Sequence, residues 1–350
     1  MEAILKKKKS LLIVVVLMCF QITSCGKADI PDKQFVEEIP VTSTENTIIQ
    51  ESSNQESDLE EIPTQELPSE TLDTPTVSED ITQNENIQET LLTQTGTLHF
   101  IDAWGEWHDA NVIGGLKKYP YNLEALKVDG NNVSYTADDG YTVRFGIDVS
   151  KWQGKIDFNK VKESGVEFVI IRLGFRGYGQ AGNIKEDVRF HENIKAAKEA
   201  GLDVGVYFYA QAINEEEALE EAEFVLKTIE GYELDLPVVY DPELIRDDTA
   251  RTDNVTGEQF TKNTIVFCEA IKAAGYEPMI YSNMIWEAFL FDISKLQEYK
   301  FWYADYEPSP QTPYHFEFWQ YSEKGSVKGI SGNVDLNIQF IRKNAEATIR

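Results

Sequence analysis

The chain lacks several features that define common protein classes. Its 350 residues include only three Cys and four His, with no cluster of the two, which argues against a disulfide scaffold and against a metal site. No apolar run approaches the roughly 20 residues that a membrane-spanning helix needs. Basic residues are scarce, since 32 Lys and Arg face 60 Asp and Glu and give a net charge of −28. Because nucleic acid requires a basic surface, we expect no nucleic-acid partner.

The first 25 residues have the pattern of a targeting segment. Four Lys at positions 6–9 precede an apolar run over residues 11–20, as in a secretory signal peptide. The sequence Ile-Thr-Ser-Cys-Gly follows at residues 22–26 and resembles the lipobox of bacterial lipoproteins. The resemblance implies that Cys25 becomes the lipidated first residue of the mature chain and anchors it to a membrane. An ordinary signal peptide with an incidental Cys is the alternative.

Residues 26–95 are predicted to form a disordered acidic linker. Residues 27–95 carry a net charge of −15 and a single aromatic side chain, Phe35. Such a segment cannot bury enough apolar surface to offset the entropy lost on ordering. A spacer between a membrane and a distant target and a merely solubilising tail both fit this composition.

Residues 143–342 are predicted to fold as one α/β domain. Eight short apolar runs occur there, and helix-like stretches at 157–164, 186–200, 214–230 and 256–274 separate the first five. This alternation favours parallel strands in a (β/α)8-type barrel, with an incomplete helix ring where the last connections are short. A doubly wound open sheet is the alternative, weakened by the lack of a Gly-rich loop after the first strand. The runs are Val143–Asp148, Phe168–Phe175, Val204–Ala210, Pro237–Tyr240, Pro278–Ser282, Phe301–Tyr306, Phe316–Tyr321 and Val334–Phe340.

Residues 96–142 precede the barrel and are predicted to form a small N-terminal β extension. Residues 97–103 have a strand pattern, and residues 133–137 and 141–145 suggest a hairpin that turns at Asp139-Gly140. Trp104 and Trp107 lie in this segment. These two residues and His108 could extend a binding groove, but we favour simple packing for all three.

Acidic residues gather where the predicted strands end. Asp148 closes the first run, Asp241 and Glu243 follow the fourth, and Asp335 lies in the last. Barrel enzymes carry their sites at the carboxyl ends of strands, so these four acids are predicted to converge. Residues two apart in an extended chain face the same side, so Asp241 and Glu243 form a carboxylate pair in which one pKa rises, as a general acid requires. For single acids, a helix cap or surface turn is the alternative.

Aromatic and amide side chains accompany these acids. Aromatic rings stack on the apolar faces of sugars, and amides bind sugar hydroxyls. We therefore predict a carbohydrate site, although for any one aromatic residue core packing is the simpler interpretation. The predicted substrate-binding residues are Trp152, Tyr209, Tyr281, Trp302, Tyr306 and Gln320.

Three ordered motifs carry a resemblance to a known family. They are Gly-Ile-Asp-Val-Ser-Lys-Trp-Gln-Gly at 146–154, Asp-Pro-Glu at 241–243, and Phe-Trp-Gln-Tyr-Ser at 318–322 with Gly329-Ile330 and Val-Asp-Leu-Asn at 334–337. From about Gly146 to Phe340 the chain resembles glycoside hydrolase family 25, the Chalaropsis-type lysozymes. Pro242 departs from the commonest filler of the Asp-x-Glu pair and could shift its two carboxylates.

The resemblance implies hydrolysis of the β-1,4 bond between N-acetylmuramic acid and N-acetylglucosamine in peptidoglycan. It implies Glu243 as the general acid, Asp241 as a partner that positions or polarises the substrate's N-acetyl group, and Asp148 and Asp335 in the acid cluster. No cofactor is implied, and the stereochemical course stays open. We expect a membrane-tethered muramidase outside the cytoplasm that faces the cell wall. A non-catalytic glycan-binding lipoprotein and a glycosidase for another N-acetylated polymer, such as chitin, are the alternatives.

Overall fold

The computed structural model describes residues 91–93, 95–246 and 248–343. The predicted signal peptide, Cys25 and residues 26–90 of the predicted linker lie outside the described residues. Leu91, at the end of that linker, forms an antiparallel bridge with Lys117. The β extension therefore includes residues before its predicted start at 96. No helix among the described residues is long and apolar enough to cross a membrane.

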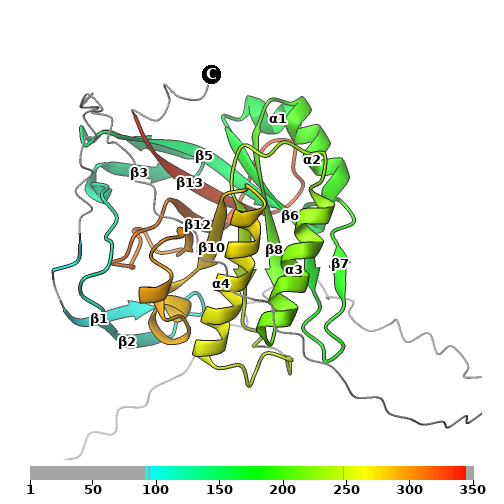
Figure 1. Cartoon of the computed structure of the whole chain (residues 1–350). Coiled ribbons are helices and arrows are strands. Elements are labelled where there is room, and N and C mark those ends of the chain that lie inside the picture. Colours follow the sequence, from blue (N-terminus) through cyan, green and yellow to red (C-terminus); the bar gives the residue numbers. More distant parts are fainter. Residues whose placement is uncertain (1–90, 94, 247, 344–350) are drawn as a thin grey trace, which may run out of the picture. The chain divides into compact units, whose positions relative to one another are not determined.

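The predicted eight-stranded barrel is confirmed as a closed ring by the strand pairings. Figure 1 shows several of its strands, with the α-helices gathered on one side. Neighbouring strands pair around the ring, and β13 pairs back onto β5 to close it. A short strand, β7 (Ile184–Glu186), forms an antiparallel hairpin with the end of β6. In ring order the barrel strands are β5 (Tyr141–Val149), β6 (Phe168–Arg176), β8 (Asp203–Ala210), β9 (Val238–Pro242), β10 (Pro278–Ser282), β11 (Lys300–Ala304), β12 (Phe318–Gly325) and β13 (Val334–Arg342).

The expectation of parallel strands throughout is wrong for the last strand. β13 runs antiparallel to both of its neighbours, β12 and β5. Only residues 326–333 connect β12 to β13, which is too short for the crossover that a parallel pair needs. As a result, the first residues of β13 lie at the same end of the barrel as the last residues of the other strands.

Four α-helices cover part of the barrel. They are α1 (Phe158–Glu163), α2 (Phe190–Glu199), α3 (Glu215–Thr228) and α4 (Gly257–Ala273). Side chains of Asp157, Asn214 and Thr256 cap three of them by accepting hydrogen bonds from backbone N–H groups of the first turn. The only helical segments that the described chain contains between β10 and β13 are a short π-helix, η3 (Trp286–Leu290), and a 3-10 turn, η4 (Ile293–Lys295). This leaves the β11, β12 and β13 wall without α-helices of its own.

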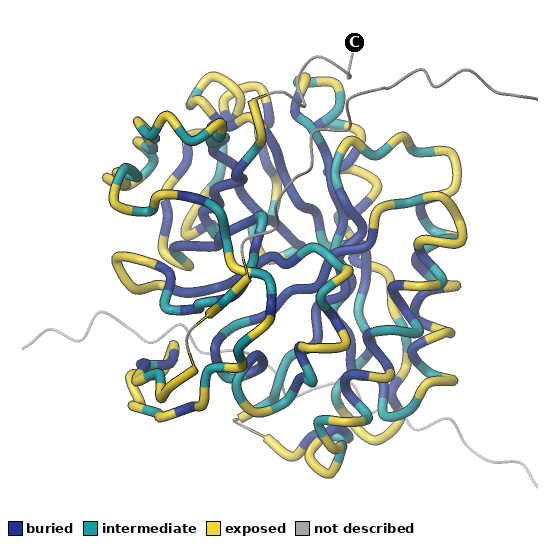
Figure 2. The backbone as a smooth tube through the Cα atoms, turned by 60° about the vertical axis from the view of Figure 1, so that its left-hand side comes forward, coloured by how far each residue is buried: buried dark blue, intermediate teal, exposed yellow. Residues whose placement is uncertain are grey.

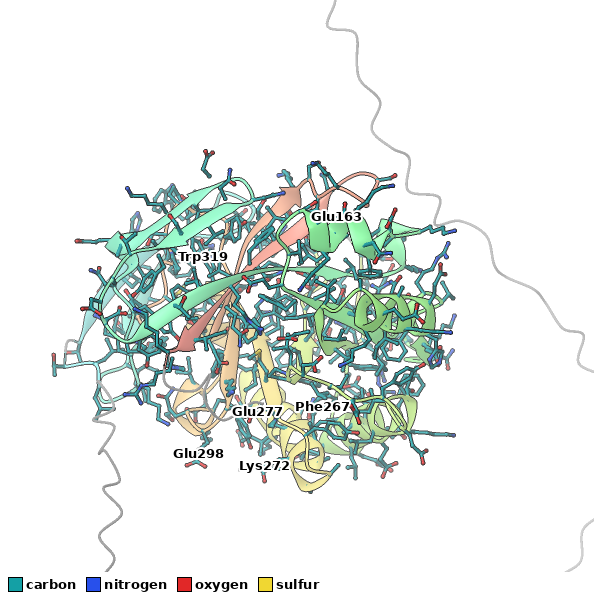
Figure 3. All side chains as sticks on the ribbon, turned by 90° about the horizontal axis from the view of Figure 1, so that it is seen from above. Glu163, Phe267, Lys272, Glu277, Glu298 and Trp319 are labelled. Atoms are coloured by element: carbon teal, nitrogen blue, oxygen red, sulfur yellow. The ribbon has the colours of Figure 1, made fainter. Side chains whose placement is uncertain are left out.

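The hydrophobic core has two layers, one inside the barrel and one between the barrel and its covering elements. The interior is filled by large side chains, among them Phe168, Trp302 and Phe318, and the strands are the most deeply buried part of the chain (Figure 2). A Cβ atom on Gly146 would lie 2.3 Å from the Phe168 ring, so this strand position requires Gly. Seen from above, charged residues such as Glu163 and Glu298 lie at the periphery (Figure 3).

The N-terminal extension forms two separate hairpins. β1 (Gly96–Ile101) pairs with β2 (Trp107–Val112), and β3 (Leu126–Asp129) pairs with β4 (Asn132–Tyr135) after the short 3-10 turn η1 (Leu123–Ala125). The hairpin predicted at Asp139-Gly140 is therefore wrong. The second hairpin turns at Gly130-Asn131. Gly130 belongs to the other Asp-Gly pair of the segment, Asp129-Gly130, and adopts a φ of +56° in this turn.

The extension is fastened to the barrel by polar and aromatic contacts. The backbone of Ile101 exchanges two hydrogen bonds with the side chain of Gln311, both at 2.9 Å. The Tyr121 hydroxyl donates to the Phe316 carbonyl at 2.6 Å. The Tyr121 ring also stacks on Phe340, with ring centroids 3.9 Å apart. These contacts hold the extension beside the β11–β12 connection.

Candidate active site

The four predicted acids lie at one end of the barrel. Asp148 is the second-last residue of β5, Asp241 is the second-last of β9 with Glu243 just beyond that strand, and Asp335 is the second residue of β13. Because β13 is antiparallel, Asp335 pairs directly with Asp148 across the two strands. Asp148 and Asp241 are each only 4 % exposed, whereas Glu243 and Asp335 are half-buried. We refer to these four residues as the acid cluster.

Two buried amides hold the carboxylate of Asp148. Its Oδ2 accepts hydrogen bonds from Gln320 Nε2 at 2.9 Å and from Asn337 Nδ2 at 2.8 Å. Gln320 is itself fixed, because its Oε1 accepts from the hydroxyls of Tyr281 at 2.9 Å and Tyr306 at 3.0 Å. Three of the predicted substrate-binding residues thus orient an acid through one network. Charged acceptors make strong hydrogen bonds of this kind, so the network defines the position of Asp148.

Trp302 has a different position from the predicted one. Its side chain is 1 % exposed and packs edge-on against Tyr281, with ring centroids 4.9 Å apart. Its Nε1 donates to Asn337 Oδ1 at 2.8 Å. A ring enclosed in the barrel cannot offer a face to a sugar, so the prediction of direct stacking is wrong for Trp302. Trp302 is connected to the site only indirectly, by its hydrogen bond to Asn337, which in turn donates to Asp148.

Asp148 and Asp335 form the first pair of acids. Burial raises the pKa of Asp148, although hydrogen bonds from Asn337, Gln320 and Asp335 oppose this rise. Burial, the negative charge of Asp148 and the hydrogen bond with Asp148 raise the pKa of Asp335 to about 9. With a pKa of about 9, Asp335 keeps its proton at neutral pH and can donate a hydrogen bond to Asp148.

Asp241 and Glu243 form the second pair. Burial raises the pKa of Glu243 to about 7, helped by the charge of Asp148 and opposed by that of Arg172. Burial and the charges of Glu243 and Asp148 raise the pKa of Asp241 well above its usual range. The Oδ1 atom of Asp241 is buried and has no hydrogen-bond partner among the described residues. Glu243 can therefore hold a proton near pH 7, as a general acid requires. Asp241 Oδ1 is an acceptor that a substrate group can use.

The Arg172 guanidinium at the site is held by Asp187, a residue not predicted from the sequence. Arg172, on β6, donates from Nε to Asp187 Oδ2 at 2.7 Å. Asp187 is 1 % exposed and also accepts from the backbone N–H of Lys151 at 3.0 Å. The predicted strand ends include Arg172 and Asn337, and this pattern places both at the barrel mouth without giving either a role in the site. Asp187 follows β7, and no local pattern marks it.

Two further predicted residues flank the acid cluster. Tyr209 is half-buried on β8 and pairs with Asp241 on β9. Trp152 lies in the 3-10 turn η2 (Lys151–Gln153), which Ser150 caps directly after β5. The Trp152 side chain is 72 % exposed, with Lys151 Nζ 4.5 Å from its ring centroid. Both aromatic rings are accessible beside the acids, so either can meet a bound molecule.

Comparison with known proteins identifies sequence relatives of the barrel. Residues 147–330 match the family described as Glycosyl hydrolases family 25. The autolytic lysozyme of Clostridium acetobutylicum is 33 % identical over 195 residues, which cover 55 % of this chain and 54 % of that protein. Lysozyme M1 of Streptomyces globisporus is 32 % identical over 202 residues, covering 55 % of this chain and 66 % of that one. The chain thus spans about half the length of the first relative.

A solved structure shares the fold. The modular autolysin LytC from Streptococcus pneumoniae superimposes with a TM-score of 0.50 and 24 % sequence identity, covering 72 % of this chain and 58 % of that chain. At that identity the likeness concerns the arrangement of strands and helices. The matched region of the sequence comparisons contains Asp148, Asp241 and Glu243, while Asp335 lies just beyond residue 330.

Proposed function

The chain belongs to glycosyl hydrolase family 25, and from this membership we propose that it hydrolyses the β-1,4 bond between N-acetylmuramic acid and N-acetylglucosamine in peptidoglycan. Two relatives that share about a third of their aligned residues with it are named lysozymes. The observation that carries the proposal is the acid cluster, in which a half-buried Glu243 has a pKa of about 7. Glycosidic cleavage needs such a donor beside a second carboxylate.

In the proposed reaction Glu243 is the general acid. It donates its proton to the glycosidic oxygen as the bond from that oxygen to the anomeric carbon breaks, so the leaving sugar departs as a neutral alcohol. Water then supplies the hydroxyl of the new reducing end and returns a proton to the Glu243 carboxylate. The charge of Asp148 supports this role, because it keeps the pKa of Glu243 high.

Asp241 is proposed to bind the N-acetyl group of the substrate. Its Oδ1, which is buried without a partner in the described chain, is suited to accept a hydrogen bond from the amide N–H of that group. A hydrogen bond there would orient the acetyl oxygen toward the anomeric carbon. Asp148 and Asp335 are proposed to set the electrostatic field in which Asp241 and Glu243 titrate.

Among the aromatic residues, Tyr209 and Trp152 are proposed to contact the sugar directly. Both have accessible ring surface near the acids. Tyr281, Tyr306 and Gln320 act mainly by holding Asp148 in place. No resident cofactor or metal ion is part of the proposed reaction.

The test is digestion of isolated peptidoglycan by the full chain, followed by counting and identifying the new reducing ends. Wild-type protein is expected to release fragments that end in N-acetylmuramic acid, and Glu243→Gln is expected to release almost none. Fragments that end in N-acetylglucosamine would refute the proposed bond. Equal release by both proteins, or none by either, would refute the catalytic role, and binding without release would favour a glycan-binding lipoprotein.

The location of the protein is a separate proposal that rests on sequence alone. We propose that Cys25 carries a lipid and holds the chain on the outer side of the membrane, facing the cell wall, with residues 26–90 as the linker. A lipid contributes about 0.8 kcal/mol per buried CH₂ group, so two chains anchor durably. Labelling cells with a radioactive fatty acid is expected to mark the wild-type protein and not Cys25→Ser, which should leave the membrane fraction. Equal labelling of both would refute the anchor.

A further inference from the structure

A cavity lies between the N-terminal extension and the barrel, beside the acid cluster. Its volume is about 410 Å³, within the range of small-molecule sites. The extension contributes residues 101–105 to one wall, and the ends of β10, β11 and β12 contribute the rest. Tyr281 and Tyr306 line this cavity and also hydrogen-bond to Gln320, which contacts Asp148. The cavity is therefore continuous with the network that orients the acids.

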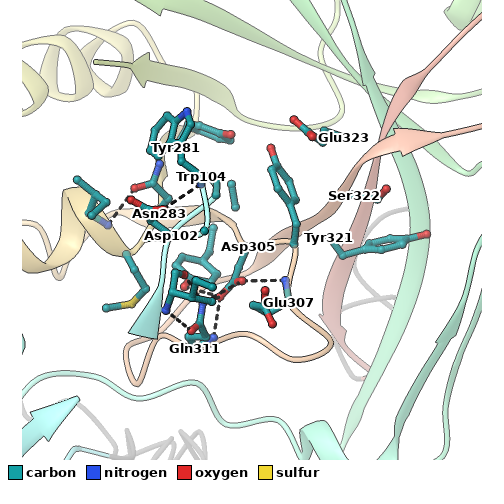
Figure 4. A pocket seen from close by; sticks show the side chains of 18 of the residues that line it. Asp102, Trp104, Tyr281, Asn283, Asp305, Glu307, Gln311, Tyr321, Ser322 and Glu323 are labelled. Carbon is teal, nitrogen blue, oxygen red and sulfur yellow. Dashed lines mark hydrogen bonds between the residues drawn. The ribbon is translucent and has the colours of Figure 1, made fainter. Parts of the chain in front are cut away.

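Trp104 gives the cavity an exposed aromatic wall. Its side chain is 54 % exposed although it lines the cavity, where Figure 4 shows it near Tyr281 and across from Glu323. The Arg246 guanidinium lies 4.0 Å from the centroid of the indole ring, and Arg246 pairs with Glu106 at 3.2 Å. Trp104 is thus held in place by contacts on one side, which lowers the entropy lost when a ligand stacks on it.

The same contacts connect the extension to the loop that carries Glu243. Arg246 follows Glu243 by three residues and meets the extension at Trp104 and Glu106. Asp102 and His108 complete this corner with a hydrogen bond of 2.9 Å. Asp102, Glu106 and His108 are close enough together to hold a metal ion. Because their ligand atoms already have partners within the chain, we assign them the role of fixing the Trp104 loop.

The polar groups of the cavity suit a neutral ligand with many donors. Glu307 is an exposed acid that lines the cavity. Asn283 is oriented by backbone donors, from Ile285 at 3.0 Å and Trp286 at 3.3 Å, which both reach its Oδ1 and leave Nδ2 for a ligand. Lys324 pairs with Glu323 at 2.7 Å, and Asp102 and Asp305 leave the lining negative, which disfavours an anion. Carboxylate and amide groups beside an aromatic face match the hydroxyls and the apolar face of a pyranose ring.

We propose that this cavity binds a further N-acetylhexosamine unit of the glycan strand, away from the bond that is cleaved. The inference rests on the proposed function for the identity of the strand. In this proposal residues 101–105 supply a sugar site beside the barrel, although they lie outside the matched family region of 147–330. The extension would thereby favour long strands over short fragments.

The test compares binding of glycan fragments of increasing length to the full chain carrying Glu243→Gln, by calorimetry with purified tetra-, hexa- and octasaccharides from peptidoglycan. Affinity is expected to rise with length, and adding Trp104→Ala should weaken octasaccharide binding about tenfold. Trp104→Phe should retain most of the affinity. The matched control is Trp107→Ala: Trp107 is 61 % exposed in the same extension but stacks on His99 at 4.5 Å and does not line the cavity. It should bind like the parent.

Unchanged octasaccharide binding by Trp104→Ala, or an equal loss in Trp107→Ala, would overturn the proposal. The result is separable from the proposed function. If wild-type protein releases no reducing ends and Trp104→Ala still weakens binding, the sugar site stands and the hydrolase proposal fails. If wild-type protein cleaves peptidoglycan and Trp104→Ala binds normally, the reverse holds.

Discussion

The barrel mouth and the helix-covered wall each contain a glutamate whose pKa burial raises to about 7. At the mouth this is Glu243, and in the wall it is Glu221 on α3. Glu221 is fully buried, and its Oε1 accepts hydrogen bonds from Arg176 Nε at 2.8 Å and from the backbone N–H of Gln211 at 3.1 Å. Its main partners are therefore a cation and a backbone donor of the same chain.

Glu243 has different neighbours. It is half-buried at the end of a strand, and the groups that affect its pKa are the acid Asp148 and the cation Arg172. A raised pKa by itself thus reports burial at both places. What distinguishes Glu243 is that it lies among other acids at an accessible barrel end, where a substrate can take its proton.

Among variants that test the comparison of Glu243 with Glu221, Glu243→Gln is expected to have the largest effect, a loss of activity. We expect kcat to fall about 10²–10⁴-fold, because proton donation to the leaving group is removed. The free energy of unfolding at pH 7 should not fall, since burial already opposes the charged form of Glu243. Reducing-end release and urea unfolding measure the two quantities. If Glu243→Gln lost activity only because it unfolded, Glu243 would have a structural role like that of Glu221, and the distinction between the two residues would fail.

The opposite result is expected for Glu221→Gln. Arg176 is only 4 % exposed, and it would lose a buried charged partner while keeping Glu220 at 3.0 Å. We expect the free energy of unfolding to drop by about 2–4 kcal/mol, with kcat of the folded protein near that of wild type. Urea unfolding and activity per folded molecule test this. A drop in kcat comparable to that of Glu243→Gln would contradict it.

A smaller effect is expected from the amide that orients Asp148. Gln320→Leu removes a hydrogen bond of 2.9 Å to that carboxylate, and kcat/KM should fall about tenfold. Gln339→Leu is the matched control, because Gln339 accepts a hydrogen bond of 3.1 Å from Arg144, toward the other end of β13. The control should keep its kcat/KM even where its stability changes. An equal loss in both variants would mean that the Asp148 network has no special role.

The smallest expected effect concerns stability and pH. The pKa of Asp335 is about 9 in the folded chain against an ordinary value of 3.8, so the folded state holds a proton that the unfolded state releases between those values. The free energy of unfolding therefore decreases as pH rises through this window. Asp335→Asn should remove part of the decrease and stabilise the protein by about 1 kcal/mol at pH 8. Urea unfolding at pH 5 and pH 8 tests this, and a larger decrease in the variant would contradict the sign.

The sequence allowed the barrel and the convergence of the acids to be predicted because both depend on local patterns. Short apolar runs that end in Asp148 or Asp241 specify a strand and the residue at its tip, and closure of the barrel brings the tips together. The direction of β13 was missed, although the short stretch 326–333 excludes a parallel crossover and could have revealed it.

Other features depend on contacts between distant residues, which a single sequence does not display. Two Asp-Gly pairs offer equivalent turns, and Asp129-Gly130 marks the hairpin while Asp139-Gly140 does not. Trp302 lies in the middle of β11, and its ring is enclosed against Tyr281. Asp187 matters only because folding brings it to Arg172.

The central claim is that Glu243 donates a proton at the barrel mouth, and the pH dependence of kcat/KM on peptidoglycan strands tests it most directly. Glu243 must be protonated to act, and its pKa is about 7. The account predicts that kcat/KM falls as pH rises above about 7, approaching tenfold per pH unit. A kcat/KM that stays constant or increases from pH 7 to pH 9 would contradict it.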